Sequence, residues 1–347
     1  MPVIAEVILM HVFSYVFPKE VLATVQMVSK AWHEAANNGY NWRDINISTL
    51  NNKSMNGFLL THGKHLNSLQ IQRLRLSRKA TYTILHKCKS LLTLNLKKVY
   101  SCSMLDDRFC FLISKIQTLK TLILPAFTSI GTTGFKNICK LQNLETLCLQ
   151  RNSCIRNFTQ LKMLEKLRDV DLSGCPCIDN SFCHQIAKLK IHRLVLSFCF
   201  SITLEGIKMF FAVKHLQLRI LVLNGLNYTP EVLQKYIAKK APNLHTISLN
   251  SLVIDQHVYN TLPHFKHLKN ITIIGCSKIT DFRIFKHANN ICICRTMFDV
   301  VGSRGLVAFA ARNKSIKVFL YDNYAIGNRQ ELFTHVKKLN NVTIQYS

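Results

Sequence analysis

The cysteines of this 347-residue chain could bind a metal or act as nucleophiles, and their spacing in the sequence shows whether either is feasible. Zinc sites need about four ligands that converge on one point, usually two Cys pairs or a Cys pair with two histidines. The tightest pairs are Cys175 with Cys177 and Cys292 with Cys294, and neither has a second pair or a histidine at metal-ligand spacing. We therefore expect these thiols to pack in the interior, and we expect no metal.

A thiol nucleophile is the other chemistry that the cysteines suggest. Cys183 precedes His184, but a nucleophile needs a base that faces it, and adjacent residues on a helix point apart. The chain also lacks a phosphate-binding glycine loop, a dinucleotide-binding fingerprint and a recognisable pair of catalytic carboxylates. We expect a protein that is not an enzyme and has no cofactor.

The elements that carry these residues follow a repeat. Leu91, Leu94 and Leu96 form a spacing that returns ten times. The middle residues of successive copies lie about 25 residues apart, which is the period of leucine-rich repeats. The later copies are Leu119/Leu122/Leu124, Leu144/Leu147/Leu149, Leu167/Val170/Leu172, Ile191/Leu194/Leu196, Leu218/Leu221/Leu223, Leu244/Ile247/Leu249, Leu268/Ile271/Ile273, a blurred copy near Ile291 and Cys294, Ile316/Phe319/Tyr321 and Leu339/Val342/Ile344.

This repeat predicts an α/β solenoid over residues 49–347, with about eleven units. The leucines should point inward from parallel strands, and the residues between them should face the concave side. Helices should cover the convex side, for example at Phe182–Leu189, Leu204–Val213, Pro230–Lys240 (with Thr229 as a cap) and Gly305–Asn313. On the concave side we expect a protein or peptide ligand to bind Asn95, Gln150, Asp171, Arg193, Asn224, Asn250 and Asn270.

Two details of the repeat follow from the same pattern. The unit after Trp42–Ile47 can be aligned on Leu66, Leu69 and Ile71 or on Ile71, Leu74 and Leu76, and the regular spacing favours the first alignment. A cysteine follows several strands, and a small, poorly hydrated side chain suits the tight turn there. We expect Cys175, Cys199 and Cys276 to be packed in this way.

The first 48 residues do not follow the repeat and form a separate head domain in our interpretation. Apolar residues at helical spacing predict a helix that ends before Pro18, a second helix over Lys19–Val28 and a third over Ser29–Ala36. Three short helices bury little apolar surface by themselves, so a partner or the first repeat should cover part of it. A helical cap for the solenoid is the simplest role of such a head.

The head also resembles an F-box. The resemblance rests on Val7–Val16, Pro18–Leu22, Val28–Trp32 and Trp42–Ile45, and with the repeats it covers nearly the whole chain. The chain is thus similar to the F-box/leucine-rich-repeat proteins, and its cysteines resemble the cysteine-containing repeat subtype. This resemblance implies binding to a Skp-type adaptor through Ile4, Leu9, Phe13, Leu22, Val28 and Trp32, which either face the adaptor or pack the head.

The same resemblance implies a function. The adaptor would join the chain to the cullin and RING subunits of an SCF-type ubiquitin ligase, and the repeats would hold a protein substrate for ubiquitination. One departure is that Ile4-Ala5 stands where the family usually has Leu-Pro, close to Met1. This departure predicts either a weaker adaptor contact or a shortened isoform. The alternative is a scaffold outside any ligase that binds an acidic protein or RNA.

Composition limits the partners. The chain has 45 Lys and Arg against 18 Asp and Glu, a formal net charge of +27, and such a balance favours encounters with acidic partners. We expect an acidic protein rather than a nucleic acid, because the charge is spread along the chain. No apolar run is long enough for a bilayer, and 13 cysteines without a disulfide framework suit the reducing cytoplasm or nucleus. We expect no signal peptide and no membrane partner.

Overall fold

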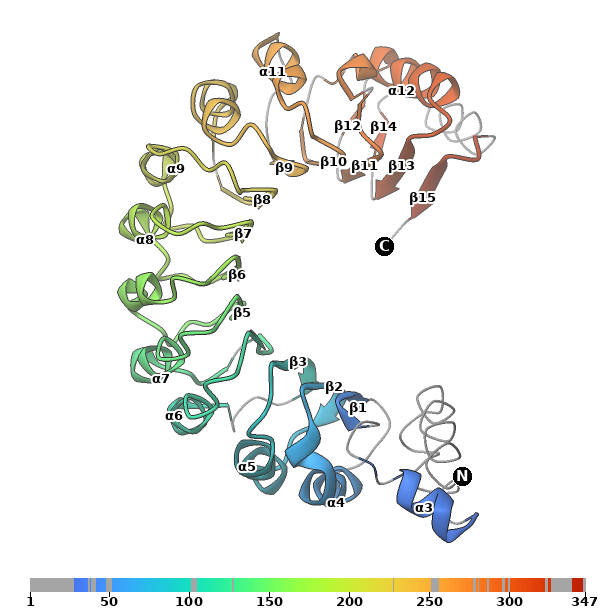
Figure 1. The fold of residues 1–347 in the computed structure, drawn as a ribbon. Helices are drawn as coiled ribbons and strands as arrows, with labels where there is room; N and C mark the ends of the chain where they lie inside the picture. The colour runs from blue at the N-terminus through green and yellow to red at the C-terminus, as the bar shows by residue number, and fades with distance from the viewer. Residues whose placement is uncertain are drawn as a thin grey trace. The chain divides into compact units, whose positions relative to one another are not determined.

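The computed structural model describes residues 28–36, 38, 42–47, 52–100, 105–126, 128–226, 228–250, 256–276, 279, 281–285, 287–294, 297–298, 300–321, 324–325 and 339–345. The chain divides into two units, Met1–Leu167 (unit 1) and Arg168–Ser347 (unit 2). Each unit repeats a strand followed by a helix or helical turn (Figure 1). The predicted alternation of α and β elements is confirmed.

Unit 1 has five parallel strands among its described residues, paired in chain order. They are β1 Asp44–Ile47, β2 Ser68–Arg75, β3 Thr93–Tyr100, β4 Thr121–Ile123 and β5 Thr146–Cys148. The helices are α3 Lys30–Ala36, α4 Asn52–His62, α5 Arg78–Lys87, α6 Asp107–Ile113 and α7 Thr132–Ile138, with the 3-10 turns η3 Gly63–His65 and η4 Thr159–Met163.

Unit 2 continues with eight parallel strands that are again paired in chain order within its described part. They are β6 Asp169–Asp171, β7 Arg193–Val195, β8 Ile220–Val222, β9 Thr246–Asn250, β10 Asn270–Ile274, β11 Asn290–Cys294, β13 Lys317–Tyr321 and β15 Val342–Gln345. A separate short pair joins β12 Met297–Phe298 to β14 Tyr324–Ala325. The helical elements are α8 Asn180–Ile186, α9 Leu204–Phe210, α10 Pro230–Val232, the π-helical turn η5 Leu233–Ala238, α11 Gln256–Thr261, the 3-10 turns η6 Leu262–His264 and η7 Phe282–Phe285, and α12 Val300–Arg312.

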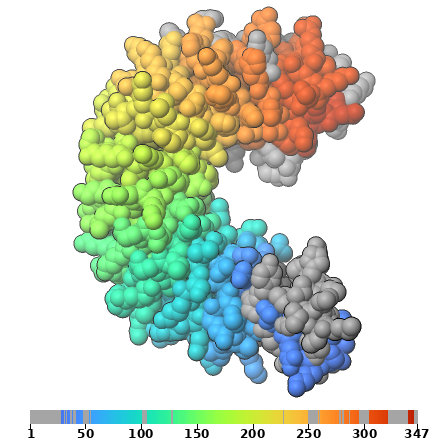
Figure 2. Space-filling view, viewed as in Figure 1, coloured from blue at the N-terminus to red at the C-terminus, as the bar shows by residue number. Residues whose placement is uncertain are grey.

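The repeated leucines form the core of each unit. In unit 1, Leu94 pairs with Leu122 and Leu122 with Leu147, and all three are fully buried. In unit 2, Val170 pairs with Leu194, which pairs with Leu221. Each buried aliphatic side chain of this kind contributes about 1.5–3 kcal/mol relative to exposure. In Figure 2 the successive repeats of unit 2, from green to red, pack directly against one another.

The structure decides the ambiguous repeat. Leu66, Leu69 and Ile71 are fully buried, and Leu69 pairs with Leu94 of the next strand. The first alignment is therefore confirmed. Leu74 is only half-buried, as expected for a residue outside the inward set.

Near the end of unit 2, the prediction that Phe319 and Tyr321 are inward residues is wrong by one position along the strand. Ile291 pairs with Val318, and the inward residues are Val318 and Leu320, which are buried. Because strand side chains alternate between faces, a shift of one residue moves the whole set to the other face. Residues 316–321 have apolar side chains at every position except Lys317, so alternation alone could not fix their register.

The predicted helices agree in place, and their ends differ by a few residues. α10 starts at Pro230, and the backbone N–H of Val232 donates to the Thr229 hydroxyl at 3.4 Å, which confirms the predicted cap. α12 begins at Val300, five residues before the predicted start at Gly305. Within the described ranges, no helix combines the length and apolar character needed to cross a bilayer.

Candidate protein-binding surface on the sheet

The residues between the inward leucines of unit 2 form two rows across its sheet. The first row occupies the strand starts, and the second lies two residues further along each strand. Cross-strand register defines both rows. The first is Asp169, Arg193, Ile220, Thr246, Asn270 and Asn290, and the second is Asp171, Val195, Val222, Ser248, Thr272 and Cys292.

Asp171 and Arg193 are two predicted site residues that the structure brings together. Arg193 Nη2 lies 3.7 Å from Asp171 Oδ2, and the carboxylate side chain is only 5% exposed. Asp171 Oδ1 also accepts from the hydroxyl of Ser173 at 2.8 Å and from its backbone N–H at 3.2 Å. Ser173 thus holds the Asp171 carboxylate in place, while the more exposed Arg193 guanidinium keeps N–H donors available to a ligand.

Asp169 lies beside this pair in the first row. Burial raises the pKa of its carboxyl group above the ordinary value, and the nearby charges of Arg193 and His192 act in the opposite direction. Its buried Oδ1 has no hydrogen-bond partner among the described residues. Because a buried oxygen without a hydrogen bond lowers the stability of the folded state, this carboxyl group destabilises the fold.

Asn224 belongs to a hydrogen-bond network that joins its own repeat to the two neighbouring repeats. Its backbone N–H donates to the Ser197 hydroxyl at 3.2 Å, and its Oδ1 accepts from the Ser248 hydroxyl. The buried Tyr228 hydroxyl donates to the carbonyl of Ser248 at 2.8 Å. Sequence analysis identified Asn224 and missed Ser248 and Tyr228, although alternation within the β9 pattern already places Ser248 on the outward face.

Asn270 belongs to an amide ladder in the first row. Its Nδ2 donates to the Thr246 hydroxyl at 3.2 Å, and its Oδ1 accepts from Asn290 Nδ2 at 2.7 Å. Asn290 was not predicted, because the repeat near Ile291 is blurred in the sequence. Asn250 ends β9, and its backbone is in register with Ile274.

The two remaining predicted substrate residues lie in unit 1. Asn95 is half-buried in β3, and its Oδ1 accepts from the backbone N–H of Lys97 at 3.1 Å, next to a shift in the β2–β3 register. Gln150 is half-buried just after β5. The predicted set is therefore divided between the two units.

Of the six predicted adaptor residues, Ile4, Leu9, Phe13 and Leu22 lie outside the described residues. Val28 is 61% exposed, which leaves its side chain accessible to a partner. Trp32 is half-buried on α3, and its backbone N–H donates to the Ser29 hydroxyl at 3.2 Å. α3 agrees with most of the predicted third helix.

An exposed aromatic pair follows β7 and was missed by sequence analysis. Phe198 and Phe200 are 51% and 73% exposed, with ring centres 6.2 Å apart. Phe198 has a φ of +59°, a left-handed conformation that is costly for a large side chain. Its ring covers Gly225, and a Cβ atom there would lie 2.6 Å from Phe198 Cδ1. A pattern of buried positions contains no signal for such a turn.

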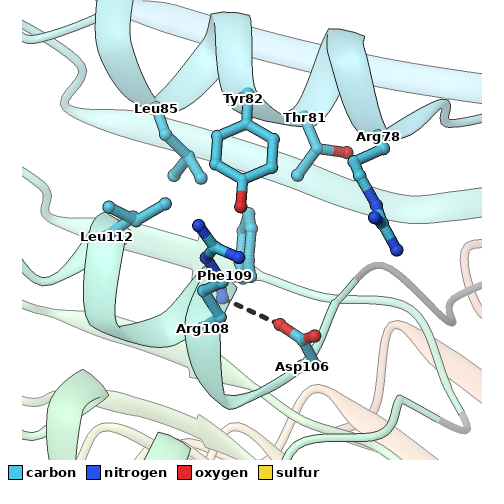
Figure 3. A pocket seen from close by; sticks show the side chains of 8 residues that line it. All are labelled: Arg78, Thr81, Tyr82, Leu85, Asp106, Arg108, Phe109 and Leu112. Carbon is cyan, nitrogen blue, oxygen red and sulfur yellow. Dashed lines mark hydrogen bonds between the residues drawn. The ribbon is translucent and has the colours of Figure 1, made fainter.

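A small hollow lies between α5 and α6 on the helix side of unit 1 (Figure 3). Arg78, Tyr82 and Arg108 line it, and the Arg108 guanidinium carbon lies 5.3 Å from the centre of the Tyr82 ring. Asp106 uses its carboxylate to cap α6, accepting from the backbone N–H of Phe109 at 2.9 Å. The volume of about 100 Å³ is well below the 300–1,000 Å³ of ordinary ligand sites.

The cysteines behave as interior side chains. Cys175, Cys199 and Cys276 are buried at the turns that leave their strands, which confirms the predicted packing role. Burial raises the pKa of the Cys183 thiol to about 12, so it lacks the thiolate character of a nucleophile. Among the described residues, no three His, Cys, Asp or Glu side chains are placed to hold a metal ion.

Comparison with known proteins adds to this geometry. The family model described as F-box-like matches residues 6–48. An internalin from Listeria monocytogenes has a similar fold, with a TM-score of 0.50 and 11% sequence identity over 96% of each chain. A leucine-rich-repeat protein of Leptospira interrogans is 15% identical over 81% of this chain and 72% of its own, with a TM-score of 0.49. No curated protein sequence matches the chain.

The F-box-like match thus precedes a series of parallel strands whose inward positions repeat. The chain combines an F-box-like segment with a leucine-rich-repeat fold. Both parts of an F-box/leucine-rich-repeat protein belong to families of interaction modules that are generally not catalytic. The chain is therefore built as a protein-interaction adaptor.

Proposed function

We propose that this chain is an F-box/leucine-rich-repeat protein and the substrate-recognition subunit of an SCF-type ubiquitin ligase. The head would bind a Skp-type adaptor, and through it the cullin and RING subunits. The repeats would bind a protein client. The observation that carries the proposal is the F-box-like match at residues 6–48 on the same chain as the repeat units. The chain would supply proximity, because holding a client near the ubiquitin donor raises its effective concentration there.

The adaptor half is tested by co-purification of the full chain with a Skp-type adaptor. We expect the wild type to retain the adaptor and the double variant Phe13→Ala, Trp32→Ala to lose it, since large aromatic side chains dominate interface free energies. Phe111→Ala is the matched control, because Phe111 is an exposed aromatic residue on α6, 47% accessible and outside the head. Circular dichroism confirms that each variant folds. Failure of the wild type to retain the adaptor at low salt would overturn the proposal.

For the client half, we propose the two rows of outward residues on the sheet of unit 2 as the recognition surface. Asp171 and Arg193 form its best-defined pair, and Asn224 and Asn270 are oriented by their own networks. Preorganised polar groups bind with less loss of side-chain entropy than free ones. Asn95, Gln150 and Asn250 remain predicted client contacts.

A second candidate function is a scaffold that acts outside any ligase and binds an acidic protein or RNA. The net charge of +27 and the Ile4-Ala5 departure support it. The two functions differ in the adaptor measurement. Retention of the adaptor supports the ligase subunit, and its absence together with binding of an acidic partner supports the scaffold.

A further inference from the structure

A ladder of basic residues runs along the strand-start edge of the sheet in unit 2. It consists of the residue that precedes each strand from β6 to β10. Backbone hydrogen bonds keep the five residues in register, since the N–H of each donates to the carbonyl of the one before at 2.7–2.9 Å. We call this ladder the basic edge, and its members are Arg168, His192, Arg219, His245 and Lys269.

A second line of side chains borders the basic edge. It lies two residues earlier in each repeat, and the residue between the two lines is a buried Ile or Leu. Both lines therefore point away from the core. The second line is also free of acidic residues at the repeats of β6 to β10, and it comprises Lys166, Lys190, Gln217, Asn243 and His267.

No carboxylate of the described residues neutralises Arg219 at the centre of the basic edge or Lys269 at its end. Within the described part of unit 2, Arg219 and Lys269 form no ion pair, and Arg219 Nη1 donates instead to the carbonyl of Leu216 at 2.8 Å. In unit 1 the same ladder position carries Lys120 and Glu145, which form an ion pair at 3.0 Å. The repeat therefore accommodates a carboxylate at this position.

Asp169 places a carboxyl group next to the first residue of the basic edge. It follows Arg168 directly, and its carboxyl group interacts with the charges of His192 and Arg193. The positive charge near β6 is thus partly offset. The stretch from Arg219 to Lys269 has no such neighbour in the first row, where Ile220, Thr246 and Asn270 are uncharged.

The dimensions of the basic edge suit an extended chain. Neighbouring strands lie about 4.8 Å apart, so five rungs span about 19 Å. An extended polypeptide rises about 3.3 Å per residue and covers that length with about six residues. Like charges along the ladder repel one another, and an anionic segment lying across it would relieve that repulsion.

A polypeptide fits this edge better than a single-stranded nucleic acid does. Nucleic-acid grooves combine positive charge with aromatic side chains on which bases stack. Neither line of the basic edge has a Phe, Tyr or Trp residue. The exposed pair Phe198 and Phe200 follows β7 at the opposite end of the strands.

We propose that the basic edge of unit 2 docks an extended acidic segment, about six residues long and rich in Asp and Glu, of the client protein. The proposal rests on the proposed function only in identifying the partner as a client. The docking itself involves neither the head nor the adaptor.

Fluorescence polarisation of the full chain with a labelled Asp/Glu-rich peptide of about ten residues tests the docking. The variant pair Arg219→Glu, Lys269→Glu should weaken binding by roughly tenfold or more, because like charges then face the peptide. The control pair Lys188→Glu, Lys239→Glu makes the same change in net charge at exposed lysines that follow helical elements of unit 2. It should change the affinity by about twofold or less. Circular dichroism confirms the folding of both pairs.

Three results would overturn the proposal. One is an equal loss in both variant pairs, which would mean that only net charge matters. Another is absence of peptide binding by the wild type, and the third is tighter binding of a single-stranded oligonucleotide with the same charge. Because the assay contains no adaptor, absence of peptide binding beside successful adaptor co-purification refutes the docking site and leaves the ligase role standing.

Discussion

Replacing His62 by Phe should remove an acid-sensitive step in the stability of unit 1. His62 closes α4 and is 3% exposed. Its ring centre lies 4.4 Å from that of Trp42 and 5.1 Å from that of Phe58. Burial, and to a smaller extent the charge of His65, lowers the pKa of His62 from 6.5 to about 4. The folded chain therefore holds this imidazole in its neutral form.

The two pKa values give the size and sign of the effect. The difference, 6.5 minus about 4, is about 2.5, and each pKa unit corresponds to about 1.4 kcal/mol. Above pH 6.5 both the folded and the unfolded chain carry a neutral ring, and the contribution is fully present. As the pH falls from 6.5 to 4, the unfolded chain gains a proton that the folded chain resists, so about 3 kcal/mol of stability is lost.

Urea unfolding between pH 7.5 and pH 4 measures this loss. Trp42 fluorescence in a Trp32→Phe background reports the surroundings of His62. The wild type should lose about 3 kcal/mol more across this range than His62→Phe or His62→Leu. His86→Gln, at an exposed position on α5, should follow the wild type. If the His62 variants show the wild-type pH dependence, the buried neutral imidazole is refuted.

Three further substitutions test the packing of the repeats by urea unfolding. Gly225→Ala should lower the free energy of unfolding by about 1–3 kcal/mol, because Gly225 has a φ of +79° and the new Cβ would meet the Phe198 ring. The control Gly57→Ala has open space around the new Cβ and should not destabilise the chain. Asn152→Ala should cost about 2–3 kcal/mol, since this buried amide bonds the Thr128 hydroxyl and two backbone N–H groups, and a loss below about 0.5 kcal/mol would contradict that role. Asp169→Asn should raise the free energy of unfolding at pH 7, because burial raises the pKa of the native carboxyl and disfavours its charged form. This gain in stability should shrink as the pH falls through that pKa. A gain that is constant with pH would be inconsistent with this cause.

The repeat could be predicted from the sequence because inward residues such as Leu94, Leu122 and Leu147 need one side-chain type at a fixed spacing. The prediction failed at residues 316–321, where apolar side chains occupy both faces of β13. Burial then gives no preference for one register, and only the pairing of Ile291 with Val318 shows which face is inward.

The candidate site was predictable as a face and not as a set of contacts. Alternation along each strand placed Asp171 and Arg193 outward, yet their pairing depends on cross-strand register between residues that are 22 positions apart. The network of Ser248 with Tyr228, and the left-handed turn at Phe198, depend in the same way on neighbouring repeats. The basic edge is visible in the sequence only after the repeats are aligned.

Client capture with and without proteasome inhibition tests the ligase role most directly. For the wild type, recovery of a bound client should rise when the proteasome is inhibited, because binding leads to ubiquitination and loss. For the variant Phe13→Ala, Trp32→Ala, the same client should be recovered equally with and without the inhibitor, because the repeats still bind while the adaptor does not. Client recovery by the wild type that does not respond to the inhibitor would contradict the account.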